Sequence, residues 1–418
     1  MKRMQVLGAL WIVLVAAGAQ GQIQQSFFGM GAVSGADLPR VSYGTLAHPP
    51  MAWTMIEGTG RGVFDFSKID PFVYGAPQDA NGVAQIDLSL AWTPSWAVAD
   101  QSKCAVQSSG MVGCTIPPDN MEDWANFITA LVGHYNGINA PHVRYYEIWN
   151  EANTSPFWTA SIKKLIAMAE MAYPILKSDP YSYVLTPSVI WAQGQGKTFM
   201  ASYLSGGGAL VADGVSFHGY PSRTGKGSKL PVPLPESAAS TNAPIQNMVP
   251  AFRQVADTNG MLGKPLVTTE GGWGVNGVSD ADMQAAWITH YEIVQAGLAA
   301  RNNLQFQTWF TWGHALSGTI ETAAGNPNRA GHSYQTVVGW LVGKTASPCT
   351  NVGTIWKCGV AADLIVWDTS QTCASGACTT WPFTVPIGYG HYVDLAGTVH
   401  TILNGTIALG VKPVMLEP

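Results

Sequence analysis

Charged residues are scarce in this chain. They make up 11% of its 418 residues, the net charge is −5, and neither a basic tract nor an acidic tail is present. Soluble proteins usually carry about a quarter of charged residues, and binding to a phosphate backbone requires clustered Lys and Arg. The composition therefore argues against nucleic acid as a partner.

Long apolar runs are missing beyond the N-terminal segment, since no later run reaches the roughly 18 residues that a membrane-spanning helix needs. The N-terminal segment itself has Lys2 and Arg3, an apolar run over 6–17, and small residues over 17–19. This order is typical of a secretory signal peptide. We predict that residues 1–21 are such a peptide and that the protein is secreted or periplasmic, with no membrane contact after cleavage. A retained anchor is the alternative.

The sequence also lacks the signs of a cysteine-based metal site, because no Cys-x-x-Cys motif and no histidine cluster is present. Its six cysteines fall in three close pairs: Cys104 with Cys114, Cys349 with Cys358, and Cys373 with Cys378. An even number of cysteines in an exported chain favours disulfides. We predict three disulfides that each close a short loop, with metal ligation as the rival interpretation.

Motifs of several enzyme classes are absent as well. The chain has no Gly-x-Ser-x-Gly nucleophile elbow and no His-Glu-x-x-His zinc motif. Neither a serine esterase nor a zinc hydrolase of those types is therefore indicated. The first predicted strand is also followed by no Gly-rich phosphate loop.

Eight short apolar runs, several of them rich in β-branched or aromatic residues, follow the N-terminal segment. They span residues 26–33, 40–47, 84–92, 143–150, 183–190, 214–221, 265–272 and 304–312. Helical patterns lie between most of them, at 121–136, 161–177, 245–260 and 282–302. The runs do not alternate polar and apolar residues, as expected for parallel strands buried on both faces. This order predicts an α/β fold, a (β/α)₈ TIM barrel, with a doubly wound open sheet as the alternative.

The pattern changes at about Thr345. From there, runs such as "LIVWD", "PFTVPI" and "HYVDLAG" are separated by Gly, Asn and Ser without helices between them. Short strands of this kind are typical of a β-sandwich. We predict a catalytic barrel over 22–344 and a small accessory β-sandwich domain over 345–418.

Two acids stand at predicted strand ends. Glu151 ends the fourth strand in "YYEIWNEAN", and Glu270 ends the seventh in "VTTEGGW". Barrel enzymes place catalytic groups at these ends. Glycoside hydrolysis needs two converging carboxyl groups, and a separation of about 5 to 5.5 Å gives double displacement with retention. Such chemistry uses no metal and no cofactor, so we expect none.

Each acid also has a simpler interpretation. Glu151 could cap a following helix, although Ser, Thr and Asp are better caps. Glu270 precedes two glycines and could be a turn residue. Glu147, inside the fourth strand, is expected to make a structural hydrogen bond or salt bridge.

These stretches resemble a known group of enzymes. "EIWNEAN" resembles the fourth-strand Asn-Glu-Pro signature of the clan A (β/α)₈ retaining glycoside hydrolases, and "VTTEGGW" resembles their seventh-strand nucleophile motif. "GRGVFDFSKIDPFV" followed by "LAWTPSWA" is similar to glycoside hydrolase family 39, the β-xylosidase-like group. The likeness covers roughly residues 25–345, and the trailing β-domain also suits that group.

The resemblance implies roles for individual residues. Glu151 would be the general acid/base, Glu270 the nucleophile, and Asn150 a hydrogen-bond partner of the sugar 2-hydroxyl. The mechanism requires one carboxyl group protonated and the other ionised, so Glu270 needs hydrogen bonds that stabilise its charge.

Further substrate-binding residues are expected around the two acids. By the resemblance, Tyr220 with His218 beside it would orient Glu270, and Trp312 would be the hydrophobic floor under the sugar ring. From their places at strand ends, we predict that His48 contacts a sugar hydroxyl and that Trp92 stacks on a sugar face.

The chain departs from the clan pattern at two points. Clan members usually carry an arginine on the second strand near the nucleophile, but here Ser42 lies inside the predicted strand and Arg40 just before it. Ala152 replaces the usual proline after the acid/base. The first departure leaves the partners of Glu270 open.

The sequence therefore predicts a secreted, retaining glycoside hydrolase that cleaves O-glycosidic bonds of plant or microbial oligo- or polysaccharides. Two alternatives share this scaffold. One is a catalytically weak carbohydrate-binding protein, and the other is a transglycosylase that passes the sugar to another sugar instead of to water.

Overall fold

A computed structural model of the protein describes residues 21–418 except 34, 77, 80–81, 84, 107–111, 223–231, 275–276 and 314–318. The predicted signal peptide lies outside the described residues, apart from its last residue. Within the described part of the chain, no helix combines the length and the apolar character needed to cross a membrane.

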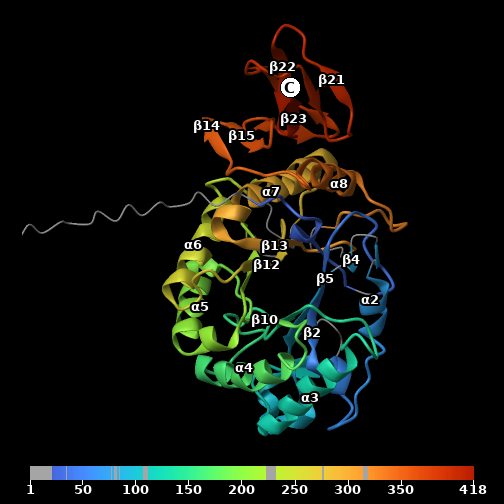
Figure 1. Cartoon of the computed structure of the whole chain (residues 1–418), viewed down its shortest axis with the longest axis vertical. Helices are drawn as coiled ribbons and strands as arrows, with labels where there is room; N and C mark the ends of the chain where they lie inside the picture. The colour runs from blue at the N-terminus through green and yellow to red at the C-terminus, as the bar shows by residue number, and fades with distance from the viewer. Residues whose placement is uncertain are drawn as a thin grey trace, which may run out of the picture.

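Eight parallel strands form the central sheet, in the order β10-β9-β5-β2-β1-β13-β12-β11. In chain order these strands are β1 (Phe28–Gly31), β2 (Thr45–Ala52), β5 (Gln85–Ala91), β9 (Tyr145–Glu147), β10 (Tyr183–Leu185), β11 (Val215–Gly219), β12 (Leu266–Gly271) and β13 (Leu304–Trp309). Parallel bridges from Leu185 to Gly214 and from Ile190 to His218 join the two ends of the sheet. The predicted (β/α)₈ barrel is confirmed, and Figure 1 shows its strands inside a ring of helices.

Burial explains why the barrel strands carry continuous apolar runs. Every residue of β1 and β11 is buried, and only the first residue of β5 is partly exposed. One face of each strand packs inside the barrel and the other packs against helices, so neither face needs polar residues.

The second strand begins later than predicted. Residues 40–44 precede β2, which starts at Thr45 and continues through a register shift between His48 and Met51. Pro49 and Pro50 lie at that shift, and proline has no N–H to donate to the neighbouring strand. A two-proline segment therefore forms part of a barrel strand, although its sequence does not favour one.

The four predicted helices are confirmed within one or two residues at their ends, and further helices complete the ring. The helices are α1 (Trp53–Glu57), α2 (Asp70–Gly75), α3 (Met121–His134), α4 (Ile162–Leu176), α5 (Gln195–Ser205), α6 (Ile245–Thr258), α7 (Ala281–Asn302) and α8 (Arg329–Leu341). Side chains of Asn120, Ser161, Asp280 and Asn328 accept backbone hydrogen bonds at the starts of α3, α4, α7 and α8. These caps satisfy N–H groups that have no partner inside the helix.

The segments that connect the barrel strands and helices contain short strands and 3-10 turns. The strands are β3 (Gln78–Asp79), β4 (Gly82–Val83), β6 (Thr93–Pro94), β7 (Cys104–Val106) and β8 (Val112–Cys114), with 3-10 turns at 25–27, 95–97, 101–103, 192–194 and 208–211. Strands β6, β8 and β7 form a small sheet after the third barrel strand.

The C-terminal region is a β-sandwich, as predicted. Its strands are β14 (Thr350–Val352), β15 (Ile355–Val360), β16 (Asp363–Asp368), β17 (Cys373–Ala374), β18 (Ala377–Cys378), β19 (Thr380–Thr384), β20 (His391–Val393), β21 (Val399–Thr401), β22 (Thr406–Gly410) and β23 (Val414–Glu417). A six-stranded antiparallel sheet, β14-β15-β16-β23-β20-β21, faces the β19-β22 pair. Val366 and Leu416 of the first layer pack with Ile407 and Leu409 of the second.

Helix α7 lies between the barrel and this sandwich (Figure 1). It is buried around most of its circumference, because barrel strands cover one side and C-terminal strands cover the other. His290, for example, is fully buried and its Nε2 lies 2.8 Å from the carbonyl oxygen of Val411. The two regions therefore share one hydrophobic core.

All six cysteines form disulfides in the predicted pairs. Cys104 bonds to Cys114 across β7 and β8, Cys373 to Cys378 across β17 and β18, and Cys349 to Cys358 at the start of the sandwich. The metal-ligation interpretation of the cysteines was wrong, since no thiol is left free.

Candidate active site

Glu151 lies on a tight turn that follows β9. Its φ is +38°, a backbone conformation that residues with a side chain rarely adopt. The turn is held in place because the backbone N–H of Glu151 donates to Ser188 Oγ at 3.0 Å and that of Ala152 donates to the Ser188 carbonyl at 3.0 Å. Helix α4 begins at Ile162 and is capped by Ser161. Glu151 therefore does not cap that helix, and its side chain is free for another role.

Glu270 is the second-last residue of the seventh barrel strand. It belongs to β12 and pairs in register with His218 of β11, so it is not a turn residue. The Tyr220 hydroxyl donates a hydrogen bond to Glu270 Oε2 at 3.0 Å. The predicted contact between Tyr220 and Glu270 is therefore present.

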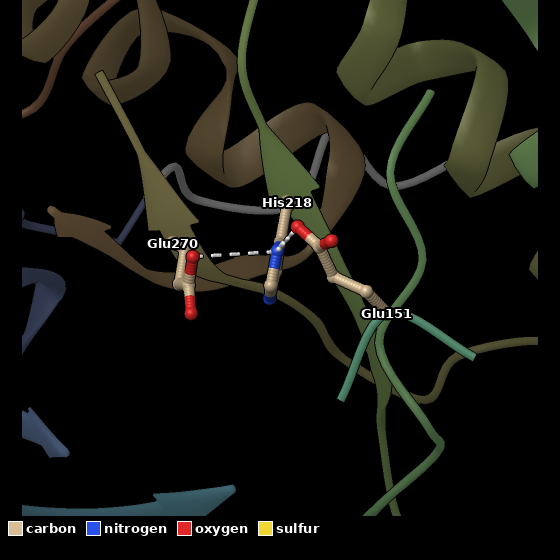
Figure 2. A group of neighbouring side chains, drawn as sticks. All are labelled: Glu151, His218 and Glu270. Carbon is tan, nitrogen blue, oxygen red and sulfur yellow. Dashed lines mark hydrogen bonds and ion pairs between the residues drawn. The ribbon is translucent and has the colours of Figure 1, made fainter. Parts of the chain in front are cut away.

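His218 lies between the two acids (Figure 2). Its Nδ1 is 3.0 Å from Glu151 Oε1 and 3.5 Å from Glu270 Oε2. The imidazole has no exposed surface, whereas the side chains of Glu151 and Glu270 are 19% and 13% exposed. Two acids 119 positions apart in the sequence thus converge on one histidine at the mouth of the barrel.

The charges of this group perturb one another. Burial raises the pKa of Glu270 to about 7, although His218 and the Tyr220 hydrogen bond both lower it. Burial alone would lower the pKa of His218, but Glu270 and Glu151 outweigh it and raise that pKa to about 9. Burial and the mutual charges of this cluster therefore place the titration of Glu270 near neutral pH.

The same three side chains could hold a cation. One oxygen of Glu151, one of Glu270 and a ring nitrogen of His218 all lie within 4.8 Å of one another, and among the described residues no other group of acids, histidines or cysteines is arranged in this way. Imidazole and carboxylate are ligands that zinc accepts. The geometry thus permits either acid/base chemistry or metal binding.

Asn150 is buried next to Glu151 and is 1% exposed. Its backbone N–H donates to the Leu90 carbonyl at 3.0 Å, and its Oδ1 lies 3.4 Å from Ser89 Oγ. The carboxamide therefore faces Ser89 in the barrel interior.

Trp312, Trp92 and His48, which were predicted to contact a sugar, are buried in the structure. Trp312 has no exposed area, Trp92 is 4% exposed, and His48 is 8% exposed. Trp92 stacks on Phe157 with ring centroids 5.0 Å apart, and His48 packs edge-on against Phe72 at 4.9 Å. Phe157 and Phe72 therefore lie against the rings of Trp92 and His48, and Trp312 has no exposed surface to offer a sugar.

Phe310 is a partly exposed aromatic residue near Glu270 that the sequence pattern does not single out. It directly follows β13, and its backbone N–H donates to the Gly271 carbonyl at 2.7 Å, next to Glu270. The peptide bond between Phe310 and Thr311 is cis. The stretch "QTWFTWG" contains three aromatic residues. Trp312, which was predicted to contact the sugar, packs inward.

The usual second-strand arginine has no counterpart at Glu270. Arg40 is exposed and its guanidinium contacts Asn326 Oδ1 at 3.3 Å. The positive group beside Glu270 is instead His218.

Comparison with solved structures identifies the fold as that of clan A glycoside hydrolases. A family 39 glycoside hydrolase from Bacteroides cellulosilyticus WH2 matches with a TM-score of 0.70 and 16% identity over 95% of this chain and 82% of that one. A monomeric β-xylosidase from Caulobacter crescentus CB15 matches with a TM-score of 0.64 and 14% identity over 95% and 97%.

Family 30 structures share the fold as well. An endoxylanase of that family from Clostridium papyrosolvens C71 matches with a TM-score of 0.56 and 12% identity over 94% of this chain and 96% of that one. No protein-family model and no curated protein matches the chain. The resemblance to family 39 that "GRGVFDFSKIDPFV" and "LAWTPSWA" indicated is thereby confirmed for the fold.

Proposed function

We propose that the protein is an exported, retaining glycoside hydrolase that cleaves O-glycosidic bonds of plant or microbial oligo- or polysaccharides. The observation that carries the proposal is the convergence of Glu151 and Glu270, with carboxyl oxygens within 4.8 Å of each other at the mouth of the barrel. Inverting enzymes need roughly 6.5 to 9.5 Å to fit a water between the two groups. The shorter separation favours direct attack by one carboxylate.

In the first step, Glu151 donates its proton to the glycosidic oxygen while Glu270 attacks the anomeric carbon. The bond from carbon to the leaving oxygen breaks, the leaving group departs as an alcohol, and the sugar becomes an ester of Glu270. Tyr220 holds the attacking carboxylate in place through its hydrogen bond. Phe310 replaces Trp312 as the proposed floor under the sugar, because it is partly exposed and its backbone bonds to Gly271, the residue after Glu270.

In the second step, Glu151 removes a proton from water. The water oxygen attacks the anomeric carbon, the ester bond breaks, and Glu270 returns to its carboxylate form. Two inversions leave the sugar with its original configuration. Asn150 is proposed to hydrogen-bond the 2-hydroxyl, which requires its carboxamide to turn from Ser89 toward the mouth.

Hydrolysis of a panel of aryl glycosides tests the proposal. Glu270→Ala should lower kcat by at least about a thousandfold, because the nucleophile is removed. The control is Glu170→Ala, which removes an exposed glutamate of α4 and should leave the rate unchanged. Equal rates for wild type and Glu270→Ala would contradict the proposal and favour the alternative of a carbohydrate-binding protein.

The substrate is proposed from the enzymes whose structures are similar. One of the similar structures is a β-xylosidase and another is an endoxylanase, so xylosides and xylan belong first in the panel. Product analysis at high acceptor concentration separates hydrolysis from transglycosylation, since a transglycosylase passes the same covalent intermediate to a sugar.

Export is part of the proposal. Three disulfides are consistent with an oxidising compartment, and the N-terminal sequence has the pattern of a signal peptide. Mass spectrometry of the mature protein from culture medium would locate the cleavage, which we predict after residue 21.

A metal-dependent hydrolase is the second candidate, because the same three side chains could bind a cation. Prolonged dialysis against a chelator distinguishes the two. We expect full activity after dialysis, since the proposed steps use side chains alone. Loss of activity that zinc restores would favour the metal-dependent reaction.

A further inference from the structure

We propose that Glu147 is a positioning residue for the reaction. From inside the barrel, it accepts hydrogen bonds from three hydroxyl groups and thereby keeps the catalytic side chains in place. The inference rests on the proposed function. Glu147 lies at the end of β9, four residues before Glu151, and has no exposed surface.

Three hydroxyl groups from three other barrel strands donate to this one carboxyl group. Ser89 Oγ of β5 lies 2.5 Å from Glu147 Oε1, and Thr269 Oγ1 of β12 lies 2.7 Å from Oε2. Ser216 Oγ of β11 also donates to Oε2, and it lies 2.8 Å from Thr269 Oγ1. A buried carboxyl group with this many donors is well satisfied, and it links the third, fourth, sixth and seventh strands.

Each donor is a near neighbour of a residue in the proposed site. Thr269 directly precedes Glu270, and Ser216 lies two positions before His218 on the same strand. Ser89 lies 3.4 Å from Asn150 Oδ1. Because side chains at positions i and i+2 share one face of a strand, Ser216 and His218 both point into the barrel, one below the other. A shift of Glu147 would therefore move several members of the site together.

The charge of Glu147 also acts on the site. It raises the pKa of both Glu270 and His218. The titratable groups that face it are Asp87 on β5, His218 on β11 and Glu270 on β12. Burial raises the pKa of Asp87, and Glu147 raises it further. The pH dependence of the reaction therefore reports the charge of Glu147, whereas a fall in kcat with little change in KM reports its positioning role.

Glu147→Gln is the first variant, because glutamine keeps the shape and one acceptor oxygen but removes the charge. We expect kcat to fall by roughly 10- to 100-fold, the cost of a misplaced catalytic group, with KM within about threefold. The acidic limb of the pH profile should move to lower pH. Asp87→Asn in the same background prevents Asp87 from replacing the lost charge, and the limb should then move at least as far.

Glu292→Gln is the matched control. Glu292 is a fully buried glutamate of α7 that accepts a hydrogen bond from Gln307 and lies outside the Glu147 network. It should leave kcat per folded protein and the pH profile unchanged. A Glu147→Gln enzyme with wild-type kcat and a wild-type pH profile would overturn the proposal.

Thr269 allows a second test that does not require altering Glu147. Thr269→Val keeps the volume and loses the hydroxyl, whereas Thr269→Ser keeps the hydroxyl and loses a methyl group. If the hydrogen bond to Glu147 positions Glu270, kcat should fall at least about threefold in the valine variant and stay near wild type in the serine variant. The opposite order would overturn the proposal.

A double-mutant cycle shows whether the two residues act together. Glu147→Gln combined with Thr269→Val should be little slower than Glu147→Gln alone, because the hydroxyl no longer has its partner. Losses that multiply would contradict a shared role. The proposed function fails separately, if Glu270→Ala is as active as wild type.

Discussion

Tyr220 makes the most direct prediction at the scale of single residues. Glu270 must be ionised to attack, so kcat/KM should fall as the pH drops through its pKa of about 7. Tyr220→Phe removes a hydrogen bond that lowers this pKa, and the acidic limb should move to higher pH by about one pH unit. Tyr203→Phe is the control, since its buried hydroxyl has no hydrogen-bond partner among the described residues. An acidic limb that stays in place in Tyr220→Phe would contradict the assignment, as would an equal shift in the control.

The sequence predicts the charged residues of the site better than its aromatic residues. Glu151 and Glu270 follow from one rule, that barrel strands end at the mouth, whereas His218 and Tyr220 are implied by the resemblance to the clan. Trp312 and Trp92 stand at strand ends too, but an indole is stable either in the core or at the mouth. Tertiary packing decides between the two, and for both tryptophans it favours the core.

At the scale of elements, the turn that carries Glu151 depends on Asn153. The carboxamide of Asn153 exchanges two hydrogen bonds with the backbone of Ile190, each 3.0 Å long. Asn153→Ala should loosen the turn and impair proton donation by Glu151. Substrates with a poor leaving group need that proton most, so their kcat should fall by roughly tenfold, the cost of losing hydrogen bonds worth about 1 kcal/mol or more. Activated dinitrophenyl glycosides should be much less affected.

A control variant separates this effect from a general loss of stability. Asn259→Ala removes a carboxamide that bonds only within the last turn of α6 and to Thr258, and it should change neither rate. If Asn153→Ala slowed both kinds of substrate equally, the turn would not act through the proton of Glu151.

Elements with strong patterns were predictable, and those with weak patterns were not. Helices α3, α4, α6 and α7 carry long apolar stretches and were predicted. Helix α5, "QGKTFMASYLS", contains glycine, serine and threonine and has only a short apolar pattern, so its sequence resembles a loop although Met200, Tyr203 and Leu204 are buried. Strand β2 begins later than its apolar run, and it includes two prolines, which a sequence pattern does not assign to a strand.

At the scale of the whole molecule, the sandwich and the barrel are joined by a buried polar contact. Trp367 Nε1 of β16 donates to Glu236 Oε1 at 2.9 Å, and His290 Nδ1 of α7 lies 2.8 Å from the same oxygen. Glu236 belongs to the segment after β11. Farther along this segment, Asn242 donates to the carbonyl of Tyr220 at 2.9 Å. The sandwich thus supports the loop that leads to the candidate site.

Replacing Trp367 tests whether the two regions unfold together. Trp367→Phe leaves the buried Glu236 without one donor, and we expect the free energy of unfolding to fall by about 1 to 3 kcal/mol. Trp381→Phe alters a tryptophan that is 68% exposed and should change it by less than about 0.5 kcal/mol. Both variants should unfold in one transition followed by calorimetry. A separate, unchanged transition for the barrel would show that the regions are independent.

The hydrophobic core shared by the barrel and the sandwich affects where a domain boundary can be drawn. A boundary between 344 and 345 remains a prediction, since it rests on the change of pattern along the chain. Helix α7 carries a sign of the docking in its sequence, because apolar and small residues predominate in "AAWITHYEIVQAGLAA" and are not confined to one face, as in a helix that is buried all round. What the sequence could not tell is which strands cover its outer face.

The central claim is that Glu270 forms a covalent bond with the sugar while Glu151 handles the proton. A 2-deoxy-2-fluoro glycoside with a good leaving group should trap that ester, because the fluorine slows its hydrolysis. Peptide mass spectrometry of the inactivated protein should then find one added sugar on the peptide that contains Glu270, and none after Glu270→Ala. Turnover of the parent glycoside with the label on another residue, or with inverted configuration in the product, would contradict the account.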